Sequence, residues 1–290
     1  MRHRTNKCNV VSLILYTLAL VGMTACATPG PVGPADRLSQ ITQSNELKIG
    51  INDGFLPFSF QKKDGSWGGF DVELGNLMAA KLGVKPKFVP MPTSQYVKAL
   101  QDNQVDVVIG GMTMTTQRSR DIYFSKPYLV GGQSILLSRA ALDRLGKLDT
   151  LSQLMGVGEK LTIAVKKGTS CEDFARAHFA KAKFLTFETR LQAIQAVLEK
   201  KADLMVHDYV FVLLWALMNR DKLETQVVPL FGPYTQDYYC IGLPKGQMDL
   251  LLWTDNFVDE ARGTGALGDI YERYFESGAW LDSLPGVPEQ

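Results

Sequence analysis

The strongest constraint in this sequence is that predicted strands and helices alternate along it in two separate sets. The first set has strands at 47–51, 87–89 and 105–109, with helices at 70–82 and 94–100. The second has strands at 161–165, 183–186, 203–206 and 226–228, with helices at 171–182, 191–200 and 208–218. Such alternation requires a mostly parallel sheet covered by helices. We therefore expect an α/β fold with two lobes.

Two extended segments, 133–137 and 238–243, are expected to cross between the lobes as hinge strands near Gly132 and Tyr239. Residues 45–132 and 238–290 then form lobe 1, and residues 133–237 form lobe 2. We also expect a small hairpin turning at 63–65, a turn-rich loop up to Gly158, and closing helices at 249–262 and 267–275. A cleft between two hinged lobes is a natural site for trapping a ligand.

The N-terminus has the pattern of an export signal. Arg2, Arg4 and Lys7 precede an apolar run at 10–22, which is too short to span a bilayer. Small residues directly before Cys26 resemble a bacterial lipobox, although an ordinary cleavage site that leaves Cys26 incidental is the alternative. We predict a signal peptide at 1–25, a lipidated tether at 26–44, and a membrane-anchored lipoprotein in the periplasm or at the cell surface.

Composition and motifs argue against several other classes of protein. The 31 Lys and Arg residues nearly balance 30 Asp and Glu residues, so nothing indicates a nucleic-acid partner. The three histidines (His3, His178 and His207) form no H-E-x-x-H motif, and the cysteines form no C-x-x-C motif. Neither a P-loop nor a G-x-S-x-G elbow occurs. We predict no catalytic residue, no metal and no cofactor.

The stretch from Gly110 to Asp121 follows the apolar strand at 105–109 and has the features of a binding loop. Its two glycines let the backbone approach a ligand, and Arg118 offers a planar pair of donors suited to a carboxylate. In open α/β sheets, ligands bind beyond this carboxyl edge. The alternative is a Thr-rich helix cap in which Arg118 makes a surface ion pair.

Six motifs, in order, give the chain a recognisable signature: Gly69–Leu74, Asp106–Thr115 with Arg118, Phe124–Tyr128, Gly168–Ser170, Ala202–Asp208 and Ile241–Gly246. Together they resemble the family-3 solute-binding proteins, which capture amino acids for ABC importers. The resemblance runs from about residue 45 to 278. It implies a type II periplasmic-binding-protein fold, a free amino acid and an ABC permease as partners, and a monomer.

The resemblance also assigns roles to single residues. Arg118 would hold the ligand's α-carboxylate, with the N–H groups of Thr113 and Ser170, at a helix N-terminus that favours an anion. Thr169 belongs to the same turn. Asp208 would pair with the α-ammonium, which the Gly111 carbonyl would share. Without the resemblance, Asp208 could simply cap its helix.

The same resemblance predicts the character of the ligand. Relatives that bind cationic side chains usually carry an Asp where this chain has Asn52, and glutamine-binding relatives have a histidine where this chain has His207. Phe55 would cover the ligand's methylenes. We expect a neutral polar amino acid, glutamine first. The alternatives are that Phe55 belongs to the core, that His207 is half-buried with its polar atoms paired, or that Phe55 and Tyr96 wall an aromatic pocket.

One enzymatic alternative stays open, the cyclohexadienyl (prephenate or arogenate) dehydratases, which share this fold and resemble the stretch 173–177. Those enzymes would carry an Asn soon after the Gly-Thr turn and a Glu entering the returning strand. This chain has Cys171 and Tyr238 nearest those positions, with Asp237 adjacent. We therefore predict a binding protein rather than an enzyme.

Two cysteines, Cys171 and Cys240, remain in the expected mature chain. An oxidising compartment would allow them to pair. We expect instead that both are small buried hydrophobic residues.

Overall fold

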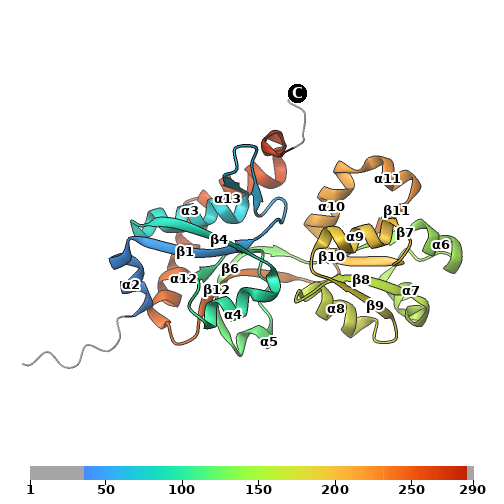
Figure 1. Ribbon diagram of the computed structural model, residues 1–290, viewed down its shortest axis with the longest axis horizontal. Helices are drawn as coiled ribbons and strands as arrows, with labels where there is room; N and C mark the ends of the chain where they lie inside the picture. The colour runs from blue at the N-terminus through green and yellow to red at the C-terminus, as the bar shows by residue number, and fades with distance from the viewer. Residues whose placement is uncertain (1–35, 231, 286–290) are drawn as a thin grey trace, which may run out of the picture. The chain divides into compact units, whose positions relative to one another are not determined.

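The computed structural model describes residues 36–230 and 232–285, which form two α/β lobes as predicted (Figure 1). Lobe 1 is built on a five-stranded sheet in the order β4-β1-β5-β12-β6. β1 is parallel to β4 and β5, whereas β12 is antiparallel to β5 and β6. The strands are β1 (Glu46–Asn52), β4 (Lys85–Met91), β5 (Val107–Val108), β6 (Ile122–Gly131) and β12 (Asp237–Pro244).

Helices cover both faces of this sheet (Figure 1). The predicted helix at 70–82 is confirmed at both ends as α3, because Gly83 takes a left-handed φ of 71° that ends it. The other elements of the lobe are α2 (Arg37–Ser44), the hairpin β2 (Phe60–Gln61) and β3 (Trp67–Gly68), η1 (Thr93–Gln95), α4 (Tyr96–Gln101), α5 (Thr116–Ser119), α12 (Met248–Gly263), α13 (Ala266–Tyr271), the short π-helix η3 (Glu272–Glu276) and η4 (Ala279–Ser283).

Lobe 2 has a second five-stranded sheet, in the order β11-β7-β10-β8-β9. Its strands are β7 (Gln133–Ser138), β8 (Thr162–Lys166), β9 (Lys183–Phe187), β10 (Leu204–Asp208) and β11 (Val227–Leu230). β8 is parallel to β9 and β10, and β7 is antiparallel to β10 and β11. Its helices are α6 (Arg139–Leu145), α7 (Leu151–Gly156), η2 (Gly158–Lys160), α8 (Ser170–His178), α9 (Arg190–Leu198), α10 (Tyr209–Met218) and α11 (Arg220–Thr225).

Four expectations need correction. The segments 133–137 and 238–243 do not cross between the lobes, because they belong to β7 in the lobe 2 sheet and β12 in the lobe 1 sheet. The loop up to Gly158 contains the helices α6 and α7, because the side chains of Ser138 and Thr150 cap their first turns. The helix expected at 171–182 ends at His178. Residues 37–44, which the sequence assigned to the tether, form α2, whose Ile41 is buried against lobe 1. Cys26 and the rest of the predicted signal and tether, residues 1–35, lie outside the described residues.

The two connections between the lobes run side by side. β6 ends at Gly131 and β7 begins at Gln133, while the returning β12 pairs Asp237 with Gly131. The Gln133 N–H also donates to the Thr235 hydroxyl at 3.0 Å. The described residues cluster as one compact unit, so the lobe boundaries given above remain predictions.

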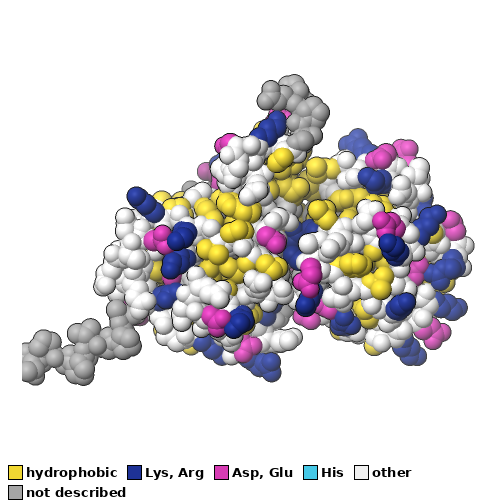
Figure 2. Space-filling model, viewed as in Figure 1, with side chains coloured by type: hydrophobic (Ala, Val, Ile, Leu, Met, Phe, Trp, Pro, Cys, Tyr) yellow, Lys and Arg dark blue, Asp and Glu magenta, His cyan; other side chains and the backbone are white. Residues whose placement is uncertain are grey.

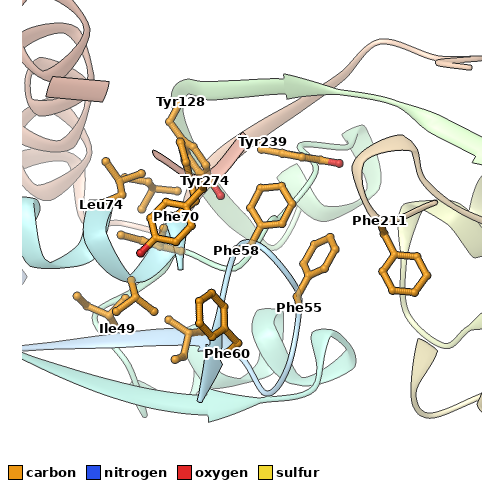
Figure 3. Packing of buried hydrophobic residues seen from close by; sticks show 14 of the residues in the cluster. Ile49, Phe55, Phe58, Phe60, Phe70, Leu74, Tyr128, Phe211, Tyr239 and Tyr274 are labelled. Carbon is orange, nitrogen blue, oxygen red and sulfur yellow. The ribbon is translucent and has the colours of Figure 1, made fainter. Parts of the chain in front are cut away.

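Aromatic side chains form the part of the core nearest the cleft (Figure 3). Phe58 lies 4.5 Å from Phe55 and 5.7 Å from Tyr239 between ring centres. Cys171 and Cys240 are free and buried, so the expectation of two small buried hydrophobic residues is confirmed. Among the described residues, no helix is both long enough and apolar enough to cross a membrane.

Candidate functional site

The carboxyl ends of parallel strands from both lobes meet at one small cavity between them. Figure 2 shows acidic and basic side chains along the boundary between the two lobes on one face of the molecule. Eight of the nine predicted ligand-binding residues line the cavity: Phe55, Gly111, Thr113, Arg118, Thr169, Ser170, His207 and Asp208. The ninth, Asn52, lies behind it. The cavity measures about 20 Å³, room for about one water molecule. An amino acid therefore requires the lobes to move apart.

Arg118 joins the two lobes across this cavity. Its Nη1 donates to the Thr113 carbonyl at 2.7 Å, and its Nη2 donates to the Gly168 carbonyl of lobe 2 at 3.0 Å. Burial lowers the pKa of the guanidinium, which still carries its charge at neutral pH. The alternative of a Thr-rich cap is half right: Thr115 does cap α5, but Arg118 bonds to carbonyls rather than to a surface carboxylate.

The N-terminus of α8 faces Arg118 from lobe 2. Thr169 is the N-cap residue, and its hydroxyl accepts from the Glu172 N–H and donates to the Lys166 carbonyl. Ser170 begins the helix, and its hydroxyl bonds to the Thr113 hydroxyl at 3.1 Å. Arg118, Thr113 and the first turn of α8 thus surround a position suited to an anion.

Asp208 ends β10 and provides the acidic side of the cavity. Its carboxylate accepts a hydrogen bond from the Tyr239 hydroxyl and lies 3.8 Å from the Cys171 sulfur. Burial raises its pKa to about 7, and the neighbouring carboxylate of Asp237 adds to this effect. Asp208 makes no side-chain cap to α10, so the simpler role of a helix cap is wrong.

Phe55 and Gly111 meet on the floor of the site. Gly111 has a φ of 58°, and any Cβ there would lie 2.6 Å from the Phe55 ring. The Gly111 N–H donates to the Tyr128 hydroxyl at 3.2 Å, and that hydroxyl donates to the buried carboxyl of Asp71 at 2.9 Å. Phe55 is itself a core residue on one side, so the alternative reading of this ring is right in part.

Asn52 is not available to a ligand in this conformation. Its amide nitrogen donates to the hydroxyls of Thr93 (3.0 Å) and Tyr96 (3.1 Å), and its oxygen accepts from Arg190 (3.3 Å). Tyr96 is fully buried and is absent from the cavity lining, so the alternative of an aromatic pocket walled by Phe55 and Tyr96 is wrong at Tyr96. Asn52 acts from behind the cavity, by orienting Arg190 and Thr93.

His207 is buried rather than half-buried, and one of its polar atoms has no partner. Its Nδ1 accepts the Asp208 N–H at 2.8 Å, which leaves the hydrogen of the neutral ring on Nε2. That Nε2 makes no hydrogen bond to any described residue. Burial and the nearby Arg190 lower the pKa of the ring, so it is neutral at physiological pH.

Two cations of the site, Arg190 and Lys166, escaped the sequence analysis. Arg190 begins α9 and lies 4.1 Å from the ring centre of Phe55 in lobe 1. Lys166 ends β8 and donates to the Thr93 hydroxyl at 3.3 Å, also in lobe 1. Both residues lie at or just after the carboxyl end of a strand of the lobe 2 sheet. Ligands bind at this edge of an α/β sheet, so their positions in the sequence could have indicated them as site residues.

Cys171, His207 and Asp208 offer three ligand atoms within 4.8 Å of one another, a spacing that a metal ion could use. Two observations argue against one. The Asp208 N–H already occupies His207 Nδ1, and the positive charges of Arg190 and Lys166 oppose a further cation. This repulsion is about twice as strong for a divalent metal as for a monovalent group, so the cluster suits an ammonium partner or a proton better than a metal.

Comparisons with known proteins agree on the family and include relatives of two kinds, an enzyme and binding proteins. The family model "Bacterial extracellular solute-binding proteins, family 3" matches residues 47–277. A cyclohexadienyl dehydratase of Pseudomonas aeruginosa is 30% identical over 260 residues, covering 89% of this chain and 93% of the relative. A glutamine-binding protein of a Bacillus subtilis ABC transporter is 25% identical, covering 92% and 97%.

Two solved structures are similar throughout the folded part. An ancestral amino acid-binding protein, described as a precursor of cyclohexadienyl dehydratase, has a TM-score of 0.73 at 33% identity, covering 83% of this chain and all of the other. A putative ABC-transporter binding component from Wolinella succinogenes, complexed with lysine, has a TM-score of 0.72 at 32% identity, covering 82% and 99%.

Proposed function

The chain belongs to the bacterial extracellular solute-binding proteins of family 3, and from this premise we propose that it captures a free α-amino acid between its lobes and delivers it to an ABC importer. The observation that carries the proposal is the arrangement of opposite charges around one cavity. Arg118 and the α8 N-terminus supply donors for a carboxylate, and Asp208 supplies an acceptor for an ammonium. Closure of the lobes would complete both contacts.

A ligand with a cationic side chain suits this site poorly. The solved relative complexed with lysine favours such a ligand, but Arg190 and Lys166 place two positive charges at the side-chain end of the cavity. The sequence favoured glutamine through Asn52 and His207. Since Asn52 already uses its amide on protein groups, only the unpartnered Nε2 of His207 is left for a glutamine side chain.

A thermal-shift screen with the twenty amino acids tests the proposal. A ligand at 100 times its dissociation constant adds about 2.7 kcal/mol to the free energy of unfolding. The best ligand should lose its effect when either its carboxylate or its ammonium is removed. Arg118→Ala should reduce the shift to about a third of its wild-type size or less. Arg220→Gln, an exposed change on α11, should keep the wild-type response. If no amino acid shifts the transition, the chain does not capture one.

The second candidate function is a dehydratase, favoured by the 30% identical relative and by Asp208. A buried carboxyl with a pKa of about 7 could protonate a leaving hydroxyl, as such a reaction requires. Incubation with prephenate and arogenate, followed by detection of phenylpyruvate or phenylalanine, tests it. Product that forms with the wild type and not with Asp208→Asn would replace the transport proposal.

We further propose that Cys26 carries a lipid that holds the protein at the membrane outside the cytoplasm, where its importer partner is reached. Family membership supports the extracellular or periplasmic location. The anchor rests on the sequence alone, and so does the monomeric state.

A further inference from the structure

Arg190 is the most unusual side chain at the cavity. It is only 5% exposed, and its guanidinium lies over the Phe55 ring. One Nη donates to the Gly54 carbonyl and the other donates to the Asn52 amide oxygen at 3.3 Å. No described carboxylate pairs with it, and its Nε has no hydrogen-bond partner. A buried guanidinium without a carboxylate partner destabilises the folded protein unless another group accepts the hydrogen bond from its Nε–H.

Lys166 is a second buried cation, near Arg190 and bonded to Thr93 of the cavity lining. It is 3% exposed, and the single hydrogen bond found for its Nζ goes to the Thr93 hydroxyl. Thr93 also accepts from Asn52, which in turn accepts from Arg190. The two cations therefore lie at the ends of one short chain of hydrogen bonds. Burial and the neighbouring Arg190 lower the pKa of Lys166 to about 8, so the ammonium is still mainly charged at neutral pH.

The side chains that line the cavity carry more positive than negative charge. Among the described residues that line it, Arg118 and Arg190 are positive and Asp208 is the one acidic side chain. Lys166 lies outside this lining, beside Arg190, and the charges of Asp53 and Asp208 act on both cations. The Nε–H of Arg190 and the Nε2–H of His207 are both buried and unpartnered, and both are donors. Such a wall suits a group that only accepts hydrogen bonds and carries a negative charge.

We propose that Arg190, Lys166 and the Nε2 of His207 receive a second carboxylate, so that the ligand is a dicarboxylate such as an acidic amino acid. The inference rests on the proposed function, because Arg118 and Asp208 would hold the α-carboxylate and ammonium of the same molecule. An amide of equal size fits less well. Its NH₂ group would face a guanidinium, an ammonium and an imidazole N–H, all of which are donors.

The shared chemistry has two possible sources: an acidic amino acid, or a cyclohexadienyl dicarboxylate of the prephenate or arogenate type. The competing explanation is purely structural. In that case Arg190 would only hold the two lobes together through its contacts with Gly54 and Phe55, and it would not affect which ligand binds.

Calorimetric titration with isosteric pairs separates these ideas. In the wild type, glutamate should bind at least about 30-fold more tightly than glutamine, and aspartate more tightly than asparagine. Arg190→Gln and Lys166→Met should each reduce the glutamate preference about tenfold or more, whereas Arg190→Lys should retain part of it. Arg220→Gln is the matched control and should leave the preference unchanged. Circular dichroism of each variant verifies that it is folded.

The titrations distinguish the second-carboxylate site from the proposal of amino-acid capture. Glutamine binding as tightly as glutamate overturns the second-carboxylate site and leaves amino-acid capture intact. A glutamate preference that survives both Arg190→Gln and Lys166→Met also overturns it. Binding of prephenate or arogenate alone, weakened by Arg190→Gln, supports the site and refutes the transport proposal. If no amino acid and no dicarboxylate binds, both proposals fail.

Discussion

Amino-acid binding should tighten as the pH rises towards neutrality, because Asp208 must be ionised to hold an ammonium. In the closed cleft this carboxyl is surrounded by the Tyr239 hydroxyl, the Cys171 thiol, and the charges of Asp237 and Arg190. Burial is the largest influence and raises its pKa to about 7. A substantial part of the population therefore carries a proton on Asp208 at mildly acidic pH.

The magnitude follows from that pKa. With a value of about 7, roughly 3% of Asp208 is ionised at pH 5.5 and roughly 75% at pH 7.5. If only the ionised form binds, the dissociation constant should fall about 25-fold between these two pH values. A carboxyl with an ordinary pKa would be ionised throughout this range and would give nearly constant affinity. Lys166, with a pKa of about 8, stays mainly protonated up to pH 7.5.

Isothermal titration calorimetry at pH 5.5, 6.5 and 7.5, in two buffers of different ionisation enthalpy, measures both affinity and proton release. Binding at pH 5.5 should release close to one proton, and binding at pH 7.5 only a small fraction of one. Asp208→Asn should bind weakly and without this pH dependence. Constant wild-type affinity with no proton release would refute the reasoning, and so would an unchanged pH profile in Asp208→Asn.

Three further predictions follow. Arg118→Ala should weaken binding by about 2–5 kcal/mol, at least roughly 30-fold. Arg118→Lys should also bind weakly, because a point charge cannot replace the planar donors of the guanidinium. Wild-type affinity of either variant in calorimetry would contradict this prediction. Burial raises the pKa of Asp71 to about 7, above its unfolded value, so its contribution to stability is lost as pH rises from about 4 to 7. Asp71→Asn should therefore gain stability relative to the wild type on going from pH 5 to pH 8, as measured by urea unfolding, and an equal pH slope in both proteins would exclude this role. Cys26→Ser should move the protein from the detergent phase to the soluble fraction, and unchanged partitioning would end the lipoprotein hypothesis.

Local signals were enough to predict the fold. The helix at 70–82 could be located to the residue because apolar residues repeat at helical spacing and Gly83 ends the pattern. The parallel strands of both sheets were identified from short apolar runs, whereas the ten-residue strand β6 was not predicted. The helices α6 and α7 were missed because six or seven residues hold too little periodicity, although the Thr150–Gln153 capping box was a usable signal.

The site was only partly accessible from the sequence, because its remaining members depend on contacts between the lobes. Arg190 was missed because an arginine that begins an amphipathic helix is usually exposed; here the other lobe buries it, with Gly54 as a partner 136 residues away. Asn52 was expected to face the ligand because only its polarity is readable in the sequence. Its bonds to Tyr96 and Arg190 required the folded chain.

The direct contacts between the lobes also set a lower limit on the size of a useful ligand. Ser170 bonds to Thr113, Lys166 to Thr93, and Arg190 to Asn52, all across the cleft. These protein groups compete with any solute for the same partners. A molecule as small as glycine could replace few of these bonds and would gain little by entering. A larger solute that forms more hydrogen bonds than it displaces favours the bound state. The contacts between the lobes therefore compete with the ligand, and only a ligand that forms better contacts can replace them.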